Sequence, residues 1–131
     1  MRETPLGLPE LGPSARTLGV RPGIDVPALA PSDAVQGGQG GASVSPDDPI
    51  NLPSYRRPTA FHGTGNDPVW MIEDANLGSD LLYRPDPLKG GHGFIEPVRP
   101  MTLDEYRRAL EQTQGLWQKV TSWPIGGSSS D

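Results

Sequence analysis

The sequence lacks cysteine and has no long apolar run. Without cysteine among its 131 residues, the chain forms no disulfide and no thiolate metal site. The absence of cysteine does not indicate a cellular compartment. No apolar stretch approaches the roughly 20 residues of a membrane-spanning helix, so we expect no membrane partner. No apolar segment of the kind found in secretory signals follows Arg2. Export would therefore need a route that does not use a signal peptide.

Positive charge is also scarce. The formal net charge is −5, because 16 acidic residues outnumber 11 lysines and arginines. Binding to a phosphate backbone requires a basic face, and the sequence holds no such cluster. We therefore expect no stable nucleic-acid complex, although an enzyme that touches RNA briefly is still compatible with this composition.

Aromatic residues are missing from residues 1–53, which hold nine prolines and eight glycines. A segment without aromatic side chains buries little apolar area to offset the entropy lost on ordering. We predict a flexible or irregular Pro/Gly-rich leader over 1–53, a small α+β domain over 54–124 and a disordered tail over 125–131. The alternative for the leader is an irregular arm that wraps the domain. Its separate apolar anchors would be Leu6, Leu8, Leu11, Leu18, Val20, Ile24, Val26 and Leu29.

Short apolar runs bounded by glycine and proline predict a small antiparallel sheet. The runs lie at 69–72, 81–84 and 92–96, and turn-forming residues separate them. We also expect a short strand over 59–65 that runs into a tight turn. The fold class is therefore α+β, with one amphipathic helix near the C-terminus after the long irregular segment.

The helix has a clear start signal. Thr102 is a suitable N-cap, and Glu105 three residues later completes a capping box. We expect Gly115 to end or fray the helix. Four apolar residues recur at spacings of three, four and seven and so share one helical face, namely Leu103, Tyr106, Leu110 and Trp117.

His92 and Glu96 are the first candidates for chemistry. They lie four residues apart in a predicted strand, so both point to the same face with Phe94 between them. An imidazole and a carboxylate on one face suffice for general acid–base catalysis or for stabilising a developing cation. The alternative is a solvent-facing polar stripe on an edge strand.

His62, Arg84 and Arg99 are further candidates. Gly63, next to His62, would let a ligand approach the backbone closely, although a half-exposed turn histidine fits the same pattern. Arg84 precedes a proline corner and Arg99 lies between two prolines, so each could present a fixed guanidinium to a phosphate or pair with a neighbouring aspartate. The two histidines match no zinc-ligand spacing, and we expect no metal.

Two blocks of the sequence resemble a family of bacterial toxins. Residues 80–86, then 92–101 and the helix that follows, are similar to the C-terminal part of small type VI secretion effectors with an ADP-ribosyltransferase-like fold. Phe61-His62-Gly63-Thr64 resembles the His-Gly-Thr opening strand of ADP-ribosyltransferases. The resemblance implies an effector toxin that acts on NAD and has a cognate immunity protein. Such a toxin is made in the bacterial cytoplasm and delivered to a target cell without a signal peptide.

The resemblance also implies residue roles. Glu96 and His62 would be catalytic, with the carboxylate steadying an oxocarbenium-like transition state. The segment from Phe61 onward is shorter than an ADP-ribosyltransferase core, so residues 1–53 would have to contribute structure or the fold would be smaller. The NAD-binding set would comprise His62, Gly63, Tyr83 as the stacking aromatic, Arg84 as a phosphate contact, and His92.

Two other classes of function stay open. A small RNase toxin would use His62 or His92 for proton transfer and Arg84 or Arg99 to stabilise the pentavalent phosphate. The acidic net charge disfavours this class, because RNA would be poorly steered. The third class is a non-enzymatic binding or immunity-type module.

The arrangement in space separates the three classes. A groove lined by His62, Tyr83 and an acidic residue would favour the NAD toxin. A pocket that holds both histidines and an arginine would favour the RNase. If His62, His92 and Glu96 do not converge, the binding module is favoured.

Overall fold

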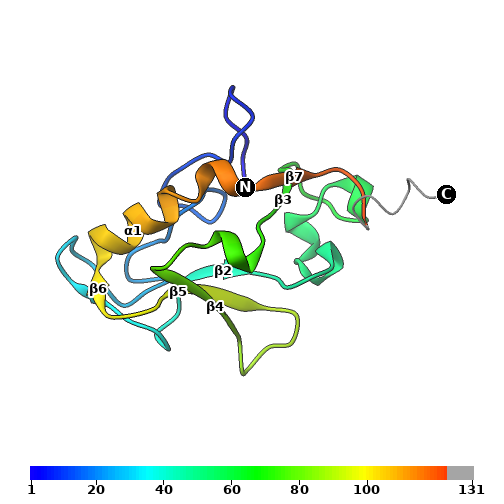
Figure 1. Ribbon diagram of the computed structural model, residues 1–131. Coiled ribbons are helices and arrows are strands. Elements are labelled where there is room, and N and C mark those ends of the chain that lie inside the picture. The colour runs from blue at the N-terminus through cyan, green and yellow to red at the C-terminus, as the bar shows by residue number, and fades with distance from the viewer. Residues whose placement is uncertain (124–131) are drawn as a thin grey trace.

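A three-stranded antiparallel sheet beneath one helix is the main feature of the computed structural model, which describes residues 1–123 (Figure 1). The strand order is β2-β5-β4, with β2 at Ala42–Val44, β5 at Gly93–Pro97 and β4 at Leu81–Pro85. Two of the predicted apolar runs form β4 and β5, which confirms an α+β fold with a small antiparallel sheet.

Two further strand pairs join distant parts of the chain. β1 (Ala34–Val35) pairs with β6 (Met101–Thr102), and β3 (Val69–Met71) pairs with β7 (Gln118–Val120). The predicted strand at 69–72 is therefore present, but its partner is β7 rather than the three-stranded sheet. Sequence reasoning did not anticipate β1, β2, β6 or β7.

The helix α1 spans Leu103–Glu111, and both hydrogen bonds of its predicted capping box are present. It is shorter than predicted. The hydroxyl of Thr113 donates to the carbonyl of Leu110 (2.7 Å) and so satisfies one of the last helical acceptors. A short 3-10 turn, η5 (Gln114–Leu116), follows. Trp117 comes after that turn, so its placement on the helical stripe was wrong.

The predicted strand over 59–65 is also wrong. The chain forms 3-10 turns at η2 (Ser54–Arg56) and η3 (Thr59–Phe61), and His62 then adopts a left-handed conformation with φ 60°. The segment bonds to itself, because the guanidinium of Arg57 donates to the carbonyl of Phe61 (2.6 Å). The remaining 3-10 turns are η1 (Pro49–Asn51) and η4 (Asp74–Asn76).

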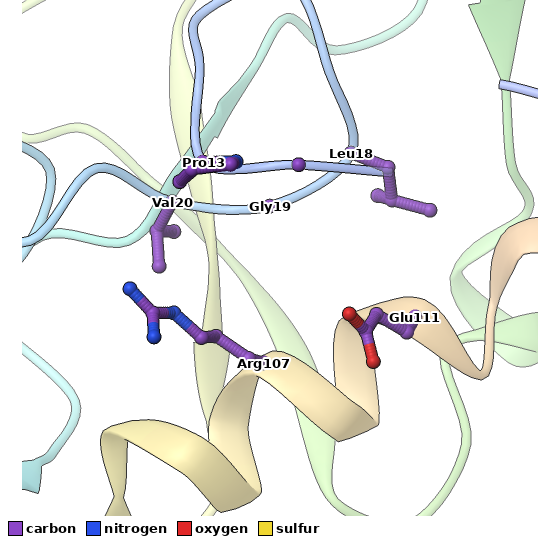
Figure 2. Close-up of a pocket in the computed structure, with 7 residues that line it drawn as sticks. Pro13, Leu18, Gly19, Val20, Arg107 and Glu111 are labelled. Atoms are coloured by element: carbon purple, nitrogen blue, oxygen red, sulfur yellow. The ribbon is translucent and has the colours of Figure 1, made fainter. Parts of the chain in front are cut away.

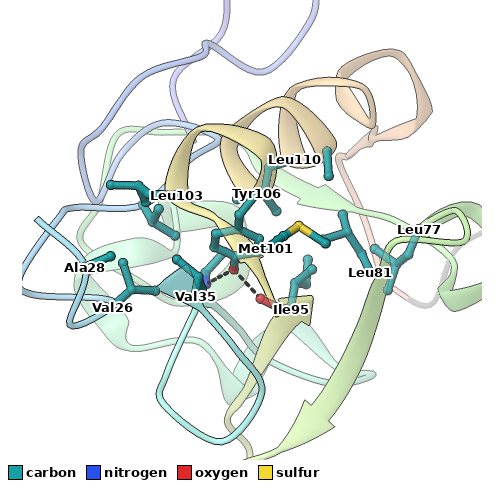
Figure 3. Packing of buried hydrophobic residues seen from close by; sticks show 13 residues of the cluster. Val26, Ala28, Val35, Leu77, Leu81, Ile95, Met101, Leu103, Tyr106 and Leu110 are labelled. Carbon is teal, nitrogen blue, oxygen red and sulfur yellow. Dashed lines mark hydrogen bonds between the residues drawn. The ribbon is translucent and has the colours of Figure 1, made fainter. Parts of the chain in front are cut away.

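The main hydrophobic core draws on residues from both sides of the predicted boundary at 53 (Figure 3). Val20, Val26 and Val35 are fully or almost fully buried against α1 and the sheet. Of the eight possible anchors, Leu18 is buried too, whereas Leu6, Ile24 and Leu29 are exposed. Residues 1–53 thus resemble the alternative, an irregular arm packed on the domain. The predicted tail at 125–131 lies outside the described residues.

Tyr106 connects the helix to the sheet from within this core. Its hydroxyl donates to the carbonyl of Ile95 in β5 (2.5 Å) and accepts from the amide of Ala42 in β2 (3.0 Å). Figure 3 shows both bonds. Burial raises the pKa of Tyr106 well above its ordinary value, because ionisation would place a charge inside the core.

Candidate functional site

The outer face of the three-stranded sheet holds a row of interacting side chains. In register, Arg84 of β4 lies opposite Phe94 of β5, and directly paired residues share a face. Alternation then places Leu81 and Ile95 on the other face, where both are buried in the core. We call the outer row the polar stripe, and it consists of Asp86, His92, Phe94, Arg84 and Glu96.

Glu96 is the most unusual member of the stripe, because it is an acidic residue of which only 2% is exposed. One carboxylate oxygen, Oε2, accepts from Nε of Arg84 (2.6 Å) and from the backbone amide of Gly38 (3.0 Å). Hydrogen bonds from two donors compensate for the burial of this carboxylate. The neighbouring Gly37 lies so close that an added Cβ would be 3.3 Å from Oε1. The glycine turn between β1 and β2 therefore covers Glu96.

Phe94 sits between the basic groups of the stripe. The guanidinium carbon of Arg84 lies 5.1 Å from the centre of the Phe94 ring, within cation–π range. The His92 ring meets Phe94 edge to face at 4.9 Å. These contacts hold Arg84 and His92 on one face of the sheet.

His92 pairs with an acid that sequence reasoning did not select. Its Nδ1 lies 2.8 Å from Oδ2 of Asp86, just beyond the end of β4. The pKa of Asp86 is lowered, first by the backbone amide of Leu88 and then by His92. Sequence reasoning gave Asp86, one of the aspartates near Arg84, no role beyond a possible ion pair with that arginine. The register of the β4–β5 hairpin is what brings it to His92 instead.

The other predicted residues lie elsewhere. Tyr83 is on the opposite face of β4 from Arg84 and packs against the core, so it does not join the stripe. Arg99 forms an exposed ion pair with Asp80, with Nη1 2.7 Å from Oδ1. No described residue links either side chain to His92 or Glu96 by a hydrogen bond.

His62 lies in the 3-10 segment rather than on the sheet. Its side chain is exposed, and within residues 1–123 no hydrogen bond joins it to His92, Arg84 or Glu96. Gly63 has a structural explanation, because a Cβ there would lie 2.0 Å from the carbonyl oxygen of Arg57. The structure therefore groups His92 with Arg84 and Glu96, and it leaves His62 and Gly63 outside this group. His62, His92 and Glu96 do not converge, and by that criterion alone the binding module is favoured.

Two shallow hollows lie away from the stripe. One, of about 250 Å³, separates the arm residues 12–20 from α1, and Figure 2 shows Arg107 and Glu111 of the helix pointing into it. The other, of about 270 Å³, lies between the η4 region and the end of α1. Of the residues singled out in the sequence as site candidates, none lines either hollow.

No protein family, curated protein or solved structure matches the chain. Within residues 1–123, no helix is long and apolar enough to cross a membrane. The same residues contain no group of three or more histidine, aspartate and glutamate side chains arranged to hold a metal ion.

Proposed function

We propose that the polar stripe is the active face of a small toxin domain that acts on NAD. The observation that carries the proposal is the buried Glu96 carboxylate, held in an ion pair with Arg84. Breaking the bond between nicotinamide and ribose sends the bonding electron pair to the pyridinium nitrogen and leaves positive charge on the ribose. A fixed anion stabilises that charge. Water or an acceptor group then attacks the ribose and loses its proton to solvent.

The neighbours of Glu96 suit the rest of such a substrate. Arg84 offers further guanidinium donors beside Nε, and a guanidinium matches the geometry of a pyrophosphate. His92 is held by Asp86 with its ring against Phe94. The proposed site departs from the criterion of convergence, because it gives His62 no role. Glu96 is catalytic, and Arg84 and His92 bind the substrate.

Substrate access requires the glycine turn to move. Gly38 donates directly to Glu96, and Gly37 lies over Oε1, so a ribose reaches the carboxylate only when this turn lifts. An added Cβ at Gly38 would meet no atom within 4 Å, so the turn is not packed on its outer side. A glycine-rich segment has the backbone freedom to open in this way.

A small RNase is the second candidate, because His92 and Arg84 share a face with Glu96. In that case one carboxylate and one imidazole would move protons while the guanidinium holds the phosphate. The net charge of −5 favours the smaller, less anionic NAD over an RNA chain.

Expression in a bacterial host tests the proposal and separates the two candidates. We expect the wild-type chain to arrest growth and deplete cellular NAD while RNA stays intact. Glu96→Gln should abolish the arrest, because the amide carries no negative charge. Glu111→Gln, which changes an exposed carboxylate on α1, is the matched control and should remain toxic.

The remaining outcomes are also informative. His62→Ala should stay toxic, because His62 lies outside the stripe; relief of arrest by this variant alone would contradict the proposed site. Cleaved RNA with normal NAD would assign the stripe to an RNase. Normal growth with well-expressed wild type would support a non-enzymatic binding module.

A further inference from the structure

The pair formed by Asp86 and His92 closes the end of the β4–β5 hairpin. Oδ2 of Asp86 lies 2.8 Å from Nδ1 of His92, and the backbone amide of Asp86 donates to the carbonyl of His92 (2.9 Å). The other carboxylate oxygen of Asp86 accepts from the amide of Leu88 (2.9 Å). Backbone and side chain therefore hold the two residues in one arrangement.

This geometry dictates which nitrogen of His92 carries the proton. A carboxylate can only accept hydrogen bonds, so Nδ1 of His92 must be the donor. When the ring is neutral, the lone pair is then on Nε2. No described residue bonds to Nε2, and the His92 side chain is 22% exposed. The acceptor atom is consequently free to meet a ligand.

The ring is also fixed in direction. It packs edge to face on Phe94 at an interplanar angle of 83°, and Phe94 in turn lies under Arg84. Arg84 bonds to Glu96, so one continuous series of contacts runs from Asp86 to the buried carboxylate. A ligand that reaches Glu96 thus lies on the same face as Nε2 of His92.

We propose that Asp86 is a positioning residue that holds His92 in its Nδ1–H tautomer, so that Nε2 accepts a hydrogen bond from a hydroxyl of the bound ligand. For NAD this group is a ribose hydroxyl, and that part rests on the proposed function. Asp86 itself does not touch the substrate. Its effect passes through the imidazole.

Nitrogen NMR of the full chain tests the positioning without any substrate. In the wild type at alkaline pH, two-bond proton–nitrogen spectra should show the neutral His92 ring protonated on Nδ1. In Asp86→Ala the proton should move largely to Nε2. Asp80→Ala, which removes the acid paired with Arg99, should leave the His92 tautomer unchanged. A wild-type ring protonated on Nε2 would overturn the proposal, whether or not the variants fold.

NAD titration of the same proteins tests the consequence. We expect Asp86→Ala to weaken NAD binding about tenfold, the effect of one lost hydrogen bond, and Asp80→Ala to bind as the wild type does. Equal affinity of the wild type and Asp86→Ala would overturn the ligand role of His92. Failure of the wild type itself to bind NAD would refute the proposed function, a result distinct from a wrong tautomer in the spectrum.

Discussion

The ion pair between Arg84 and Glu96 shows how the burial of one side chain depends on a hydrogen bond from another. Glu96 is buried and relies on two donors, whereas the Arg84 side chain is 30% exposed and remains partly hydrated. Most of the cost of breaking the pair therefore falls on the carboxylate. An exposed pair at helical spacing, Arg108 with Asp104, provides a contrast, because its side chains are 68% and 46% exposed.

Arg84→Met should lower the free energy of unfolding by about 2–3 kcal/mol, because it leaves a buried carboxylate with one donor fewer. Arg108→Met should change it by less than about 0.5 kcal/mol. Equilibrium unfolding in urea measures both values. Similar losses in the two variants would show that the Arg84 pair is an ordinary surface contact.

Tyr106 should make the stability of the fold sensitive to alkaline pH. Its pKa in the folded protein is raised above the ordinary 10.0, so the unfolded chain loses this proton first as pH rises. The contribution of the un-ionised Tyr106 to the free energy of unfolding is therefore complete below pH 10 and declines above it. Urea unfolding at about pH 9 and about pH 11 should show a larger loss of stability in the wild type than in Tyr106→Phe. Equal losses would contradict this role.

At the scale of elements, glycines fix where segments approach one another. Gly41 enters β2 with φ 151°, and an added Cβ would lie 2.6 Å from the carbonyl oxygen of Ile95 and 3.0 Å from the hydroxyl of Tyr106. Gly90, in the β4–β5 turn, has open space around it and no left-handed φ. Alanine substitutions at Gly41 and Gly90 therefore form a test and its matched control.

Gly41→Ala should cost at least about 2 kcal/mol of unfolding free energy through backbone strain and displacement of β5. Gly90→Ala should be neutral within about 0.5 kcal/mol. Differential scanning calorimetry on both variants gives the comparison. A melting temperature for Gly41→Ala equal to that of the wild type would show that β2 and β5 separate easily at this point.

Local sequence signals predicted the elements that carry their own information. The capping residues Thr102 and Glu105 identified the start of α1, and apolar runs located β3, β4 and β5. β1, β2, β6 and β7 have two or three residues each, lie in no continuous apolar run and pair with strands distant in the chain, so no local pattern predicted them. The same distinction between local and tertiary information applies to the candidate site.

The spacing of His92 and Glu96 predicted that they share a face, whereas the partners of both arise from tertiary structure. Asp86 reaches His92 only through the hairpin register, and Gly38 reaches Glu96 across 58 residues. His62 was selected by a short motif whose meaning depends on a strand. The chain forms a 3-10 turn there, because it bonds to its own neighbours.

For the whole molecule, the arm is part of the folding unit. Residues 1–53 supply Val20, Val26, Val35 and Ala42 to the core, and they supply β2 to the sheet. The N-terminal segment also contacts the β3–β7 pair, where Trp70 donates to the carbonyl of Met1 (2.8 Å). A core with these residues removed would be left open on one side.

A fragment of residues 54–131 should therefore fail to fold on its own. Its circular dichroism should lack the helical signal of the full chain, and its urea titration should show no cooperative transition. Addition of a peptide of residues 1–53 should restore some structure if the arm docks as it does in the intact chain. A fragment that unfolds cooperatively would place the domain boundary at 53 after all.

The most direct test of the central claim is the release of nicotinamide from NAD by the purified full-length chain. The proposed role of the polar stripe predicts that the wild type releases nicotinamide. The rate of release should fall at least about 100-fold in Glu96→Gln and stay unchanged in Glu111→Gln. NMR of the reaction mixture follows free nicotinamide directly. No release by a folded wild type, or equal release by wild type and Glu96→Gln, would contradict the assignment of Glu96 as the charge-stabilising group.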